Sequence, residues 1–114
     1  MPAVLALACL LMVHDGDSVR CGAERIRLAS IDAPEMRGSP KCDLGRRGWC
    51  DYPLAVQSRN ALRGFLATGT PTIERCGLDR YGRTLAMVRV NGVEAGAWLI
   101  SRRLARAWRG PTGC

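Results

Sequence analysis

The chain has 114 residues and a mass of 12.4 kDa, the size of one domain, and we expect a single domain over residues 1–114. Its 47% hydrophobic and 24% charged residues exclude a disordered chain, and no apolar run approaches the roughly 20 residues that a membrane-spanning helix needs. The net charge of +7 indicates a polyanionic partner, nucleic acid first and an acidic membrane surface second.

The first apolar run, residues 3–13, resembles the hydrophobic region of a secretion signal. No basic residue precedes it, however, and it leads directly into a polar turn at Asp15 and Gly16. We interpret residues 10–13 as a buried strand and residues 1–9 as a truncated signal or extra strand residues. We expect a secreted or periplasmic protein, with a cytoplasmic location as the alternative.

Short strands are predicted after this turn. Residues 18–21 form the second strand, residues 21–24 form a hairpin turn, and residues 25–30 form a half-buried strand in which charged and apolar side chains alternate. Pro34 then ends regular structure. Residues 36–50 hold four Gly or Pro and two cysteines, and they are predicted to be a long loop.

A helix is predicted to begin at Asp51, a capping residue followed by proline two positions later, and to end at Gly69. Residues 70–75 and 84–90 are predicted strands, the second followed by an Asn-Gly hairpin turn, and residues 95–103 are a predicted helix. This order indicates an α+β, mainly β fold. A small curled sheet with two or three packed helices results, and an OB-type barrel is one form that it can take.

Six cysteines are many for so short a chain, and they stand at positions 9, 21, 42, 50, 76 and 114. They include no Cys-x-x-Cys pair, and the single histidine, His14, is too few for a recognisable zinc site. An even number permits disulfides in an exported protein. We expect Cys42 to pair with Cys50 because they flank a loop that lacks other anchors. The alternative is a set of reduced thiols in a cytosolic protein.

Two motifs in the first half of the chain carry paired carboxylates. Asp-Gly-Asp-Ser at residues 15–18 places two carboxylates around a tight turn, which suits a hard cation such as Ca²⁺, although Asp-Gly is also a common turn. In residues 25–35, Asp32 and Glu35 flank a rigid proline that restricts the distance between them. The alternative for this segment is an exposed turn with solvated charges.

A third motif, Asp-Arg-Tyr-Gly-Arg at residues 79–83, places Arg83 where a glycine turn enters a strand, so that its guanidinium fork could grip a phosphate. The alternative is a surface hairpin with an Asp–Arg pair. The motif lies within residues 58–114, where ten Arg stand against three acidic residues and carry the whole excess of positive charge. A solvated, arginine-rich surface explains this composition equally well.

Together, in this order and at these separations, Asp-Gly-Asp-Ser, Arg-Ile-Arg-Leu-x-x-Ile-Asp-Ala-Pro-Glu and Asp-Arg-Tyr-Gly-Arg resemble the staphylococcal (thermonuclease-like) nuclease family over residues 10–108. The resemblance implies a five-stranded OB-like barrel with packed helices. It also implies a Ca²⁺-dependent, sugar-nonspecific phosphodiesterase that cuts DNA and RNA to products ending in 3′-phosphate. We therefore expect Ca²⁺ as the cofactor, DNA and RNA, preferably single-stranded, as partners, no action on membranes, and a monomer.

The resemblance further implies a calcium site. Asp17 and Asp32 match the family's calcium-binding carboxylates, and Ala33 matches the residue whose backbone carbonyl completes the protein ligands. Asp15 would support the site from a second layer.

The remaining site residues implied by the resemblance concern the substrate. Arg27 and Arg83 match the phosphate-binding arginines, and Glu35 matches the carboxylate that activates water. Tyr81 would line the nucleotide site. Arg103 stands where the family usually has Gly before Leu-Ala.

Two other functions fit parts of this pattern. One is an OB-type module that binds single-stranded nucleic acid and cuts it weakly or not at all. The retained carboxylates beside the arginines favour the nuclease over this module, because a binder does not need them. The other is a secreted basic protein that acts at membranes, against which the lack of a long amphipathic basic helix counts.

Overall fold

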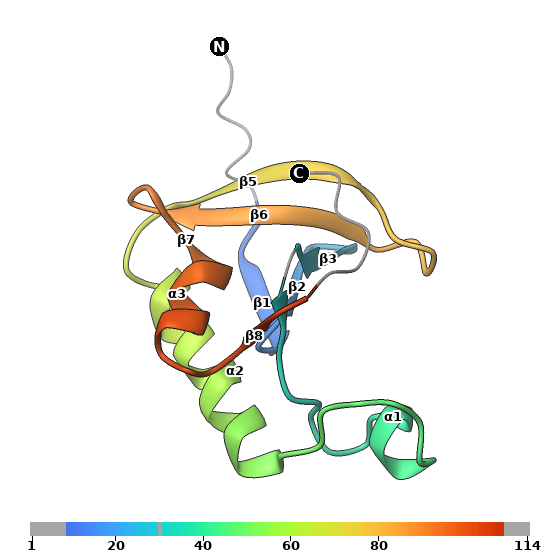
Figure 1. Cartoon of the computed structure of the whole chain (residues 1–114). Helices are drawn as coiled ribbons and strands as arrows, with labels where there is room; N and C mark the ends of the chain where they lie inside the picture. Colours follow the sequence, from blue (N-terminus) through green and yellow to red (C-terminus); the bar gives the residue numbers. More distant parts are fainter. Residues whose placement is uncertain (1–8, 30, 109–114) are drawn as a thin grey trace.

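The computed structural model describes residues 9–29 and 31–108. In this part of the chain, a mixed six-stranded sheet and a two-stranded ribbon are combined with three helices (Figure 1). The strands of the main sheet are β1 (Leu11–Asp15), β2 (Ser18–Cys21), β3 (Glu24–Leu28), β5 (Pro71–Leu78), β6 (Thr84–Val90) and β7 (Val93–Glu94). The α+β, mainly β class predicted from the sequence is therefore confirmed.

The sheet brings the separate sequence motifs to one region. Its order is β1-β2-β3-β6-β5, with β7 also paired to β6. β1, β2 and β3 are antiparallel neighbours, whereas β3 and β6 are parallel, with Ile26 opposite Thr84 and Leu28 opposite Ala86. Because Arg83 immediately precedes β6, this parallel pairing brings the turn before β6 next to β3.

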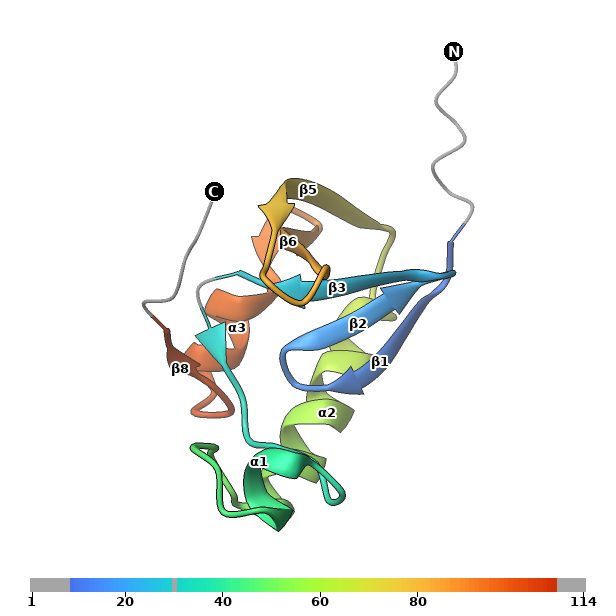
Figure 2. The same cartoon turned by 90° about the vertical axis from the view of Figure 1, so that its right-hand side faces the viewer.

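Two helices follow the predicted positions. α2 (Tyr52–Leu66) begins after Asp51, whose carboxylate accepts a hydrogen bond of 3.1 Å from the backbone N–H of Leu54, as the capping pattern predicts. α3 (Ala95–Ser101) is capped by Glu94, which accepts from two backbone N–H groups of the first turn. α2 packs against β1 and α3, and α3 packs against β6 (Figures 1 and 2).

The hydrophobic core lies between these helices and the sheet. Its largest fully buried apolar side chains come from β3, β6, both helices and the segment after β3: Ile26, Leu28, Ile31, Leu62, Val88 and Leu99. The rings of Phe65 on α2 and Trp98 on α3 are 4.8 Å apart between centroids and join the two helices. Each such buried side chain contributes about 1.5–3 kcal/mol, so the core stabilises the packing of β3 and β6 against the helices.

Four short elements were not predicted, and β7, which pairs with β6 after the Asn91-Gly92 turn, is one of them. α1 (Pro40–Asp43) is a single turn inside the predicted loop, and Ser39 caps it by accepting a hydrogen bond of 3.3 Å from the N–H of Lys41. β4 (Ile31–Asp32) pairs antiparallel with β8 (Arg106–Ala107) in a separate ribbon. α1 and its loop lie near the N-terminal end of α2, away from the β5–β6 hairpin (Figure 2).

The predicted barrel is observed only in part. β1 and β5 are the two ends of the strand order, and no pairing between them occurs within residues 9–29 and 31–108. A mixed sheet with helices on it is therefore what the structure provides, and closure into a five-stranded barrel stays a prediction.

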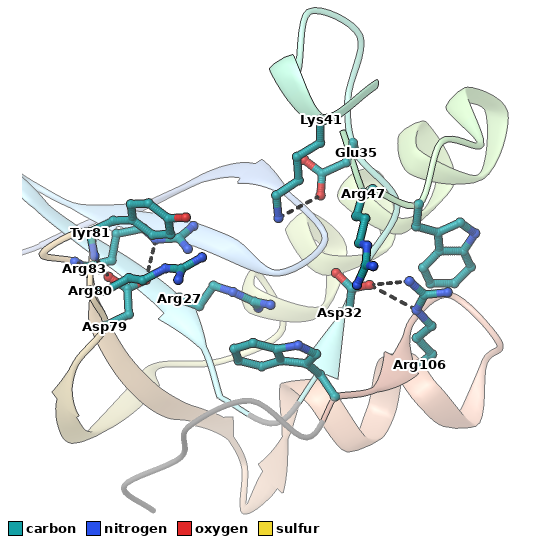
Figure 3. A pocket seen from close by; sticks show the side chains of 13 residues that line it. Arg27, Asp32, Glu35, Lys41, Arg47, Asp79, Arg80, Tyr81, Arg83 and Arg106 are labelled. Carbon is teal, nitrogen blue, oxygen red and sulfur yellow. Dashed lines mark hydrogen bonds and ion pairs between the residues drawn. The ribbon is translucent and has the colours of Figure 1, made fainter. Parts of the chain in front are cut away.

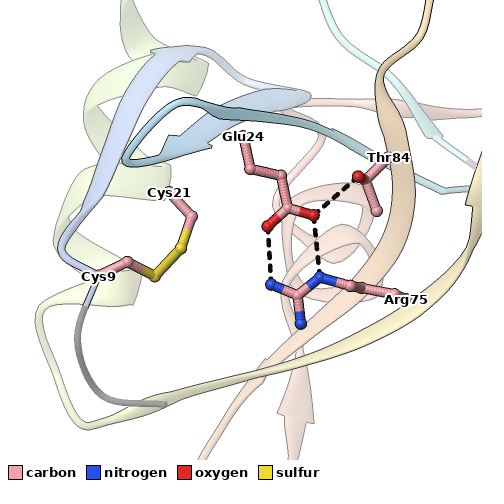
Figure 4. Close-up of a disulfide and its surroundings, with 5 residues drawn as sticks. All are labelled: Cys9, Cys21, Glu24, Arg75 and Thr84. Carbon is pink, nitrogen blue, oxygen red and sulfur yellow. Dashed lines mark hydrogen bonds and ion pairs between the residues drawn. A yellow bond between two sulfur atoms is a disulfide. The ribbon is translucent and has the colours of Figure 1, made fainter. Parts of the chain in front are cut away.

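The predicted disulfide between Cys42 and Cys50 is present, and it joins α1, which contains Cys42, to the end of the predicted loop. A second disulfide joins Cys9 to Cys21, so that it connects the residues before β1 to the end of β2 (Figure 4). None of the described cysteines is a free thiol, which overturns the alternative of reduced thiols for this part of the chain.

Beside the second disulfide, a polar cluster joins β3 to the β5–β6 hairpin (Figure 4). Arg75 grips the carboxylate of Glu24 with two hydrogen bonds of 2.7 and 2.9 Å, and the hydroxyl of Thr84 donates a third of 2.8 Å. The hydrogen bonds from Arg75 and then from Thr84 lower the pKa of Glu24 from 4.5 to about 2. This cluster therefore links the strands through the ionised carboxylate of Glu24.

No helix in the described part of the chain is long and apolar enough to cross a membrane. The signal-like residues 1–8 lie outside the described residues, and the truncated signal stays a prediction.

Candidate active site

The turn between β1 and β2 holds two buried acidic side chains. Asp15 Oδ1 accepts hydrogen bonds from the N–H of Asp17, at 3.2 Å, and from the hydroxyl of Ser18, at 2.7 Å. Gly16 sits between them in a close approach of chain segments. A Cβ there would collide with the side chains of Ser58 on α2 and Ala33, so the turn requires glycine for steric reasons.

The Asp17 carboxylate points at the next motif. Its Oδ2 accepts a hydrogen bond of 2.8 Å from the N–H of Ala33 and lies 3.4 Å from the Arg27 guanidinium. Burial, and then the neighbouring charge of Asp15, raise the pKa of Asp17 well above its usual value, and Arg27 opposes this rise. The site therefore concentrates negative charge that lacks a full counter-charge.

Arg27 is held rigidly in the floor of the site. Its side chain comes from β3, yet only 7% of the residue is exposed, so the predicted half-buried alternation of this strand is wrong here. The guanidinium donates to the backbone carbonyls of Leu28 and Ile31 at 3.1 and 2.9 Å. The ring of Trp108 covers it at 4.7 Å. Such a fixed guanidinium is suited to a phosphate because it does not have to be ordered on binding.

Asp32 faces the site from the two-stranded ribbon. Its Oδ2 accepts a hydrogen bond of 3.0 Å from Arg106 Nε and forms a salt bridge of 2.8 Å with the terminal nitrogen Nη2, because the two residues are opposite each other in the β4–β8 register. The Arg106 guanidinium also lies 4.6 Å from the Trp49 ring. Arg106 thus links the predicted metal ligand to the disulfide-closed loop.

Glu35 is surrounded by that loop. Its Oε1 accepts a hydrogen bond of 2.9 Å from the Ser39 hydroxyl, and its Oε2 lies 4.0 Å from Lys41 Nζ. Its backbone N–H donates to the carbonyl of Trp49 at 2.8 Å. Residues from the loop therefore determine both the backbone and the side-chain position of Glu35.

The turn before β6 is organised around Asp79. One oxygen accepts the backbone N–H groups of Tyr81 and Arg83, each at 2.9 Å, and the other accepts Arg83 Nε at 2.7 Å. Burial by itself would raise the pKa of Asp79, but these hydrogen bonds and the Arg83 charge outweigh it and lower the pKa. The Tyr81 ring is 59% exposed and lies beside the guanidinium groups of Arg80 and Arg83.

These segments surround one cavity of about 760 Å³ (Figure 3). Five predicted site residues line it: Arg27, Asp32, Glu35, Tyr81 and Arg83. The other three, Asp15, Asp17 and Ala33, lie behind this lining and connect to it through the Asp17–Ala33 hydrogen bond and the Asp17–Arg27 pair.

Several lining residues were missed by sequence reasoning, and they are Lys41, Arg47, Trp49, Arg80 and Arg106. Arg80 stood inside a predicted motif, and the Arg-Arg-Gly-Trp run next to Cys50 was a visible signal for the loop residues. Nothing local to Arg106 indicated that it would face Asp32.

A family model for staphylococcal nuclease homologues matches residues 25–111 of this chain. The chain belongs to the staphylococcal nuclease homologue family. A curated relative, the succinoglycan biosynthesis protein ExoI of Rhizobium meliloti (strain 1021), is 37% identical over 111 residues that cover 82% of this chain and 56% of the relative. This member of the nuclease family therefore spans little more than half the length of that relative.

The donor atoms of this nuclease homologue fit a hard cation. Asp17 and Asp32 supply carboxylates and Ala33 a carbonyl, all oxygen donors as Ca²⁺ prefers. The Asp17–Ala33 hydrogen bond places the Asp17 carboxylate beside the peptide bond that joins Asp32 to Ala33. No three His, Cys, Asp or Glu side chains within residues 9–29 and 31–108 form a metal-binding group, so an ion would depend on two carboxylates and a backbone oxygen.

Proposed function

We propose that this member of the family is a Ca²⁺-dependent, sugar-nonspecific phosphodiesterase that hydrolyses DNA and RNA to products ending in 3′-phosphate. The observation that carries the proposal is the charge of the cavity. Six cationic residues (Arg27, Lys41, Arg47, Arg80, Arg83 and Arg106) line it against three carboxylates (Asp32, Glu35 and Asp79), a surplus of three positive charges. A phosphodiester strand is the polyanion that the family assignment supports.

In this proposal the two arginines bind and orient the reacting phosphate. Arg27 is fixed by backbone carbonyls, and Arg83 by Asp79, so both guanidinium groups are ordered before the substrate arrives. As charge grows on the phosphoryl oxygens, these donors stabilise it without reorganising.

Glu35 is the proposed general base. Its carboxylate would take a proton from the attacking water as the water oxygen bonds to phosphorus. The bond between phosphorus and the 5′-oxygen would break, the 5′-oxygen would leave as a hydroxyl after it takes up a proton, and the phosphate would stay on the 3′ side. Ser39 donates to one carboxylate oxygen, at 2.9 Å, and so restricts the rotation of the group that receives the proton.

The residues that would hold Ca²⁺ are Asp17, Asp32 and Ala33. A bound ion would neutralise a phosphate oxygen and act as a Lewis acid. Arg106 pairs with Asp32 at 2.8 Å and would share this carboxylate with the ion.

The second candidate is a module that binds single-stranded nucleic acid without cutting it. Its support is that both Asp32 and Glu35 already have cationic neighbours in Arg106 and Lys41. The same cavity would then serve affinity alone, and added calcium would produce no hydrolysis. A role directed at a polysaccharide, which the name of the relative suggests, predicts no binding of nucleic acid at all.

We further propose a monomer in an oxidising compartment, secreted or periplasmic. The two disulfides support this location, because such bonds are rare in the reducing cytosol.

The test compares the wild type with Glu35→Gln on single-stranded DNA and RNA, with Ca²⁺ or with chelator. We expect calcium-dependent hydrolysis, and a loss of about 10²–10⁴-fold in turnover for the variant while binding persists. Glu74→Gln is the matched control, since Glu74 is an exposed carboxylate on β5 that pairs with Arg89 outside the cavity. Hydrolysis that continues in the presence of chelator would refute the requirement for calcium. Near-normal turnover of the Glu35 variant would refute the role of Glu35 as general base.

A further inference from the structure

We propose that segment 41–49, which the Cys42–Cys50 disulfide holds in place, forms a second nucleotide subsite, which stacks one base of a single-stranded substrate on Trp49 and binds its phosphate through Arg47. We call Lys41, Arg47 and Trp49 the loop subsite. The inference rests on the proposed function, since it assigns part of the same cavity to a further stretch of the strand.

The loop subsite is part of the cavity wall. Lys41, Arg47, Gly48 and Trp49 all line the cavity, although they belong to a loop with a single turn of helix. Two covalent or hydrogen-bonded anchors hold this loop: the Cys42–Cys50 disulfide and the 2.8 Å bond from the N–H of Glu35 to the Trp49 carbonyl. A wall fixed in this way loses little conformational freedom when a ligand binds.

In the described part of the chain, the Trp49 ring packs against no other aromatic ring, unlike the ring of Trp98. Both tryptophans are half-buried, but Trp98 packs against Phe65 with ring centroids 4.8 Å apart, whereas Trp49 lines the cavity of the candidate site. The Arg106 guanidinium lies 4.6 Å from the Trp49 ring and restrains it. A base stacked on an ordered aromatic ring is recognised through its π-face, which every base possesses.

Charge is the second observation. Residues 36–50 carry four basic side chains against one acidic side chain. Every carboxylate that lines the cavity has a cationic neighbour: Asp32 has Arg106, Glu35 has Lys41 and Asp79 has Arg83.

In the described part of the chain, Arg47 and Arg80 line the cavity and form no salt bridge. They are therefore the cations with most to gain from a phosphate.

The two uncompensated arginines lie at opposite ends of the cavity. Figure 3 shows Arg80 beside Tyr81 at one end, Arg47 near Asp32 and Arg106 at the other, and Arg27 between them. A strand whose scissile phosphate lies at Arg27 would extend toward both ends. One flanking nucleotide would meet the Tyr81 turn and the other would meet the loop subsite, a geometry that a paired duplex with stacked bases does not offer.

The test measures binding of fluorescent octathymidylate, and of an abasic octamer with the same backbone, by anisotropy in chelator so that no hydrolysis occurs. We expect Trp49→Ala to weaken octathymidylate binding by about 5- to 150-fold, as loss of one base stack predicts, to leave the abasic octamer unaffected, and Trp49→Phe to restore most of the affinity. Equal weakening of binding for both ligands, or no weakening, would refute the proposal that a base stacks on Trp49.

Arg47→Ala has a matched control in Arg46→Ala, which removes the same charge from the same loop but at a residue outside the cavity lining. Loss of one phosphate contact should reduce the slope of log affinity against log salt by about 0.7 for Arg47 alone. Equal slopes for the two variants would overturn the phosphate contact, and this measurement stands even where Trp49→Ala fails to fold. Because binding is measured without catalysis, a protein that does not hydrolyse nucleic acid yet needs Trp49 for binding would refute the phosphodiesterase and retain the subsite.

Discussion

The Cys9–Cys21 and Cys42–Cys50 disulfides allow stability and activity to be separated, because they close loops of similar length in different places. Their sequence separations are 8 residues for Cys42–Cys50 and 12 residues for Cys9–Cys21. The chain-entropy relation gives about 2.5 kcal/mol for the shorter loop and about 2.8 kcal/mol for the longer one. Replacing either pair by serine should therefore lower the free energy of unfolding by nearly the same amount, equivalent to roughly 10 °C in Tm for a domain of this size.

Activity should respond differently. The Cys42–Cys50 loop contains Trp49, which contacts Glu35, and its bridge is attached to α1, whose capping residue Ser39 also contacts Glu35. The Cys9–Cys21 bridge lies at the far ends of β1 and β2. Freeing the first loop lets the proposed base shift, and a misplacement of about 1 Å is enough for a loss of order 10²-fold. The Cys9→Ser/Cys21→Ser variant should keep most of its turnover at temperatures where it is folded.

The assay measures thermal unfolding by circular dichroism and hydrolysis of single-stranded DNA well below the Tm of both variants. We expect the two melting curves to shift together and only the Cys42→Ser/Cys50→Ser variant to lose turnover. If both variants lost activity in proportion to stability, the loop would stabilise the fold but have no role in positioning Glu35. If neither lost activity, the hydrogen bonds that the loop makes to Glu35 would be irrelevant to the reaction.

Three further predictions concern single residues. Arg103 follows α3 with a left-handed φ of 61°, so Arg103→Gly should raise the free energy of unfolding by about 1 kcal/mol in chemical denaturation, and a decrease would contradict this account. Glu24 has its pKa lowered to about 2, so its ion pair stabilises the fold fully above pH 4.5 and loses this effect as the pH falls through 2. After allowance for solvent screening, Glu24→Gln should cost of order 1 kcal/mol at pH 7 and only a small fraction of that near pH 2, and an equal difference at both pH values would refute the ion-pair origin. Ser39→Ala should lower kcat without weakening substrate binding, Ser39→Thr should restore kcat, and Ser39→Asp, which keeps the α1 cap but repels Glu35, should not.

Local signals were sufficient for most of the fold. β2 and β6 have the predicted bounds because alternation and turn residues mark both ends of each strand. α2 begins where Asp51 predicts, and the Asn91-Gly92 turn has positive φ at both residues, as a tight hairpin turn of this type requires. α1 also carried a local signal, Ser followed by Pro, that was hidden by the glycines around it.

Long-range pairing was out of reach of such signals. Arg106 and Asp32 are 74 residues apart, and two-residue strands leave no periodicity to detect. The Cys9–Cys21 pairing was likewise undetermined, because six cysteines allow many connectivities. Alternation placed Arg27 on one face of a half-buried strand together with Arg25, but Arg27 is buried and its guanidinium donates to the carbonyls of the last residue of β3 and the first residue of β4. At these positions the structure depends on contacts between residues far apart in the sequence, which periodicity within one strand does not indicate.

The Arg27–Asp17 pair indicates that this region is built for binding more than for stability. Both side chains are 8% exposed and their charged atoms are 3.4 Å apart, a distance too long to recover the full cost of desolvating both ions. An apolar pair of similar volume would fill the same space without that cost. The chain instead retains both charges and aligns the carbonyls of Leu28 and Ile31 to hold the guanidinium at the cavity. Such an arrangement becomes favourable when an anion reaches Arg27, because the ligand then supplies the charge balance that Asp17 leaves incomplete.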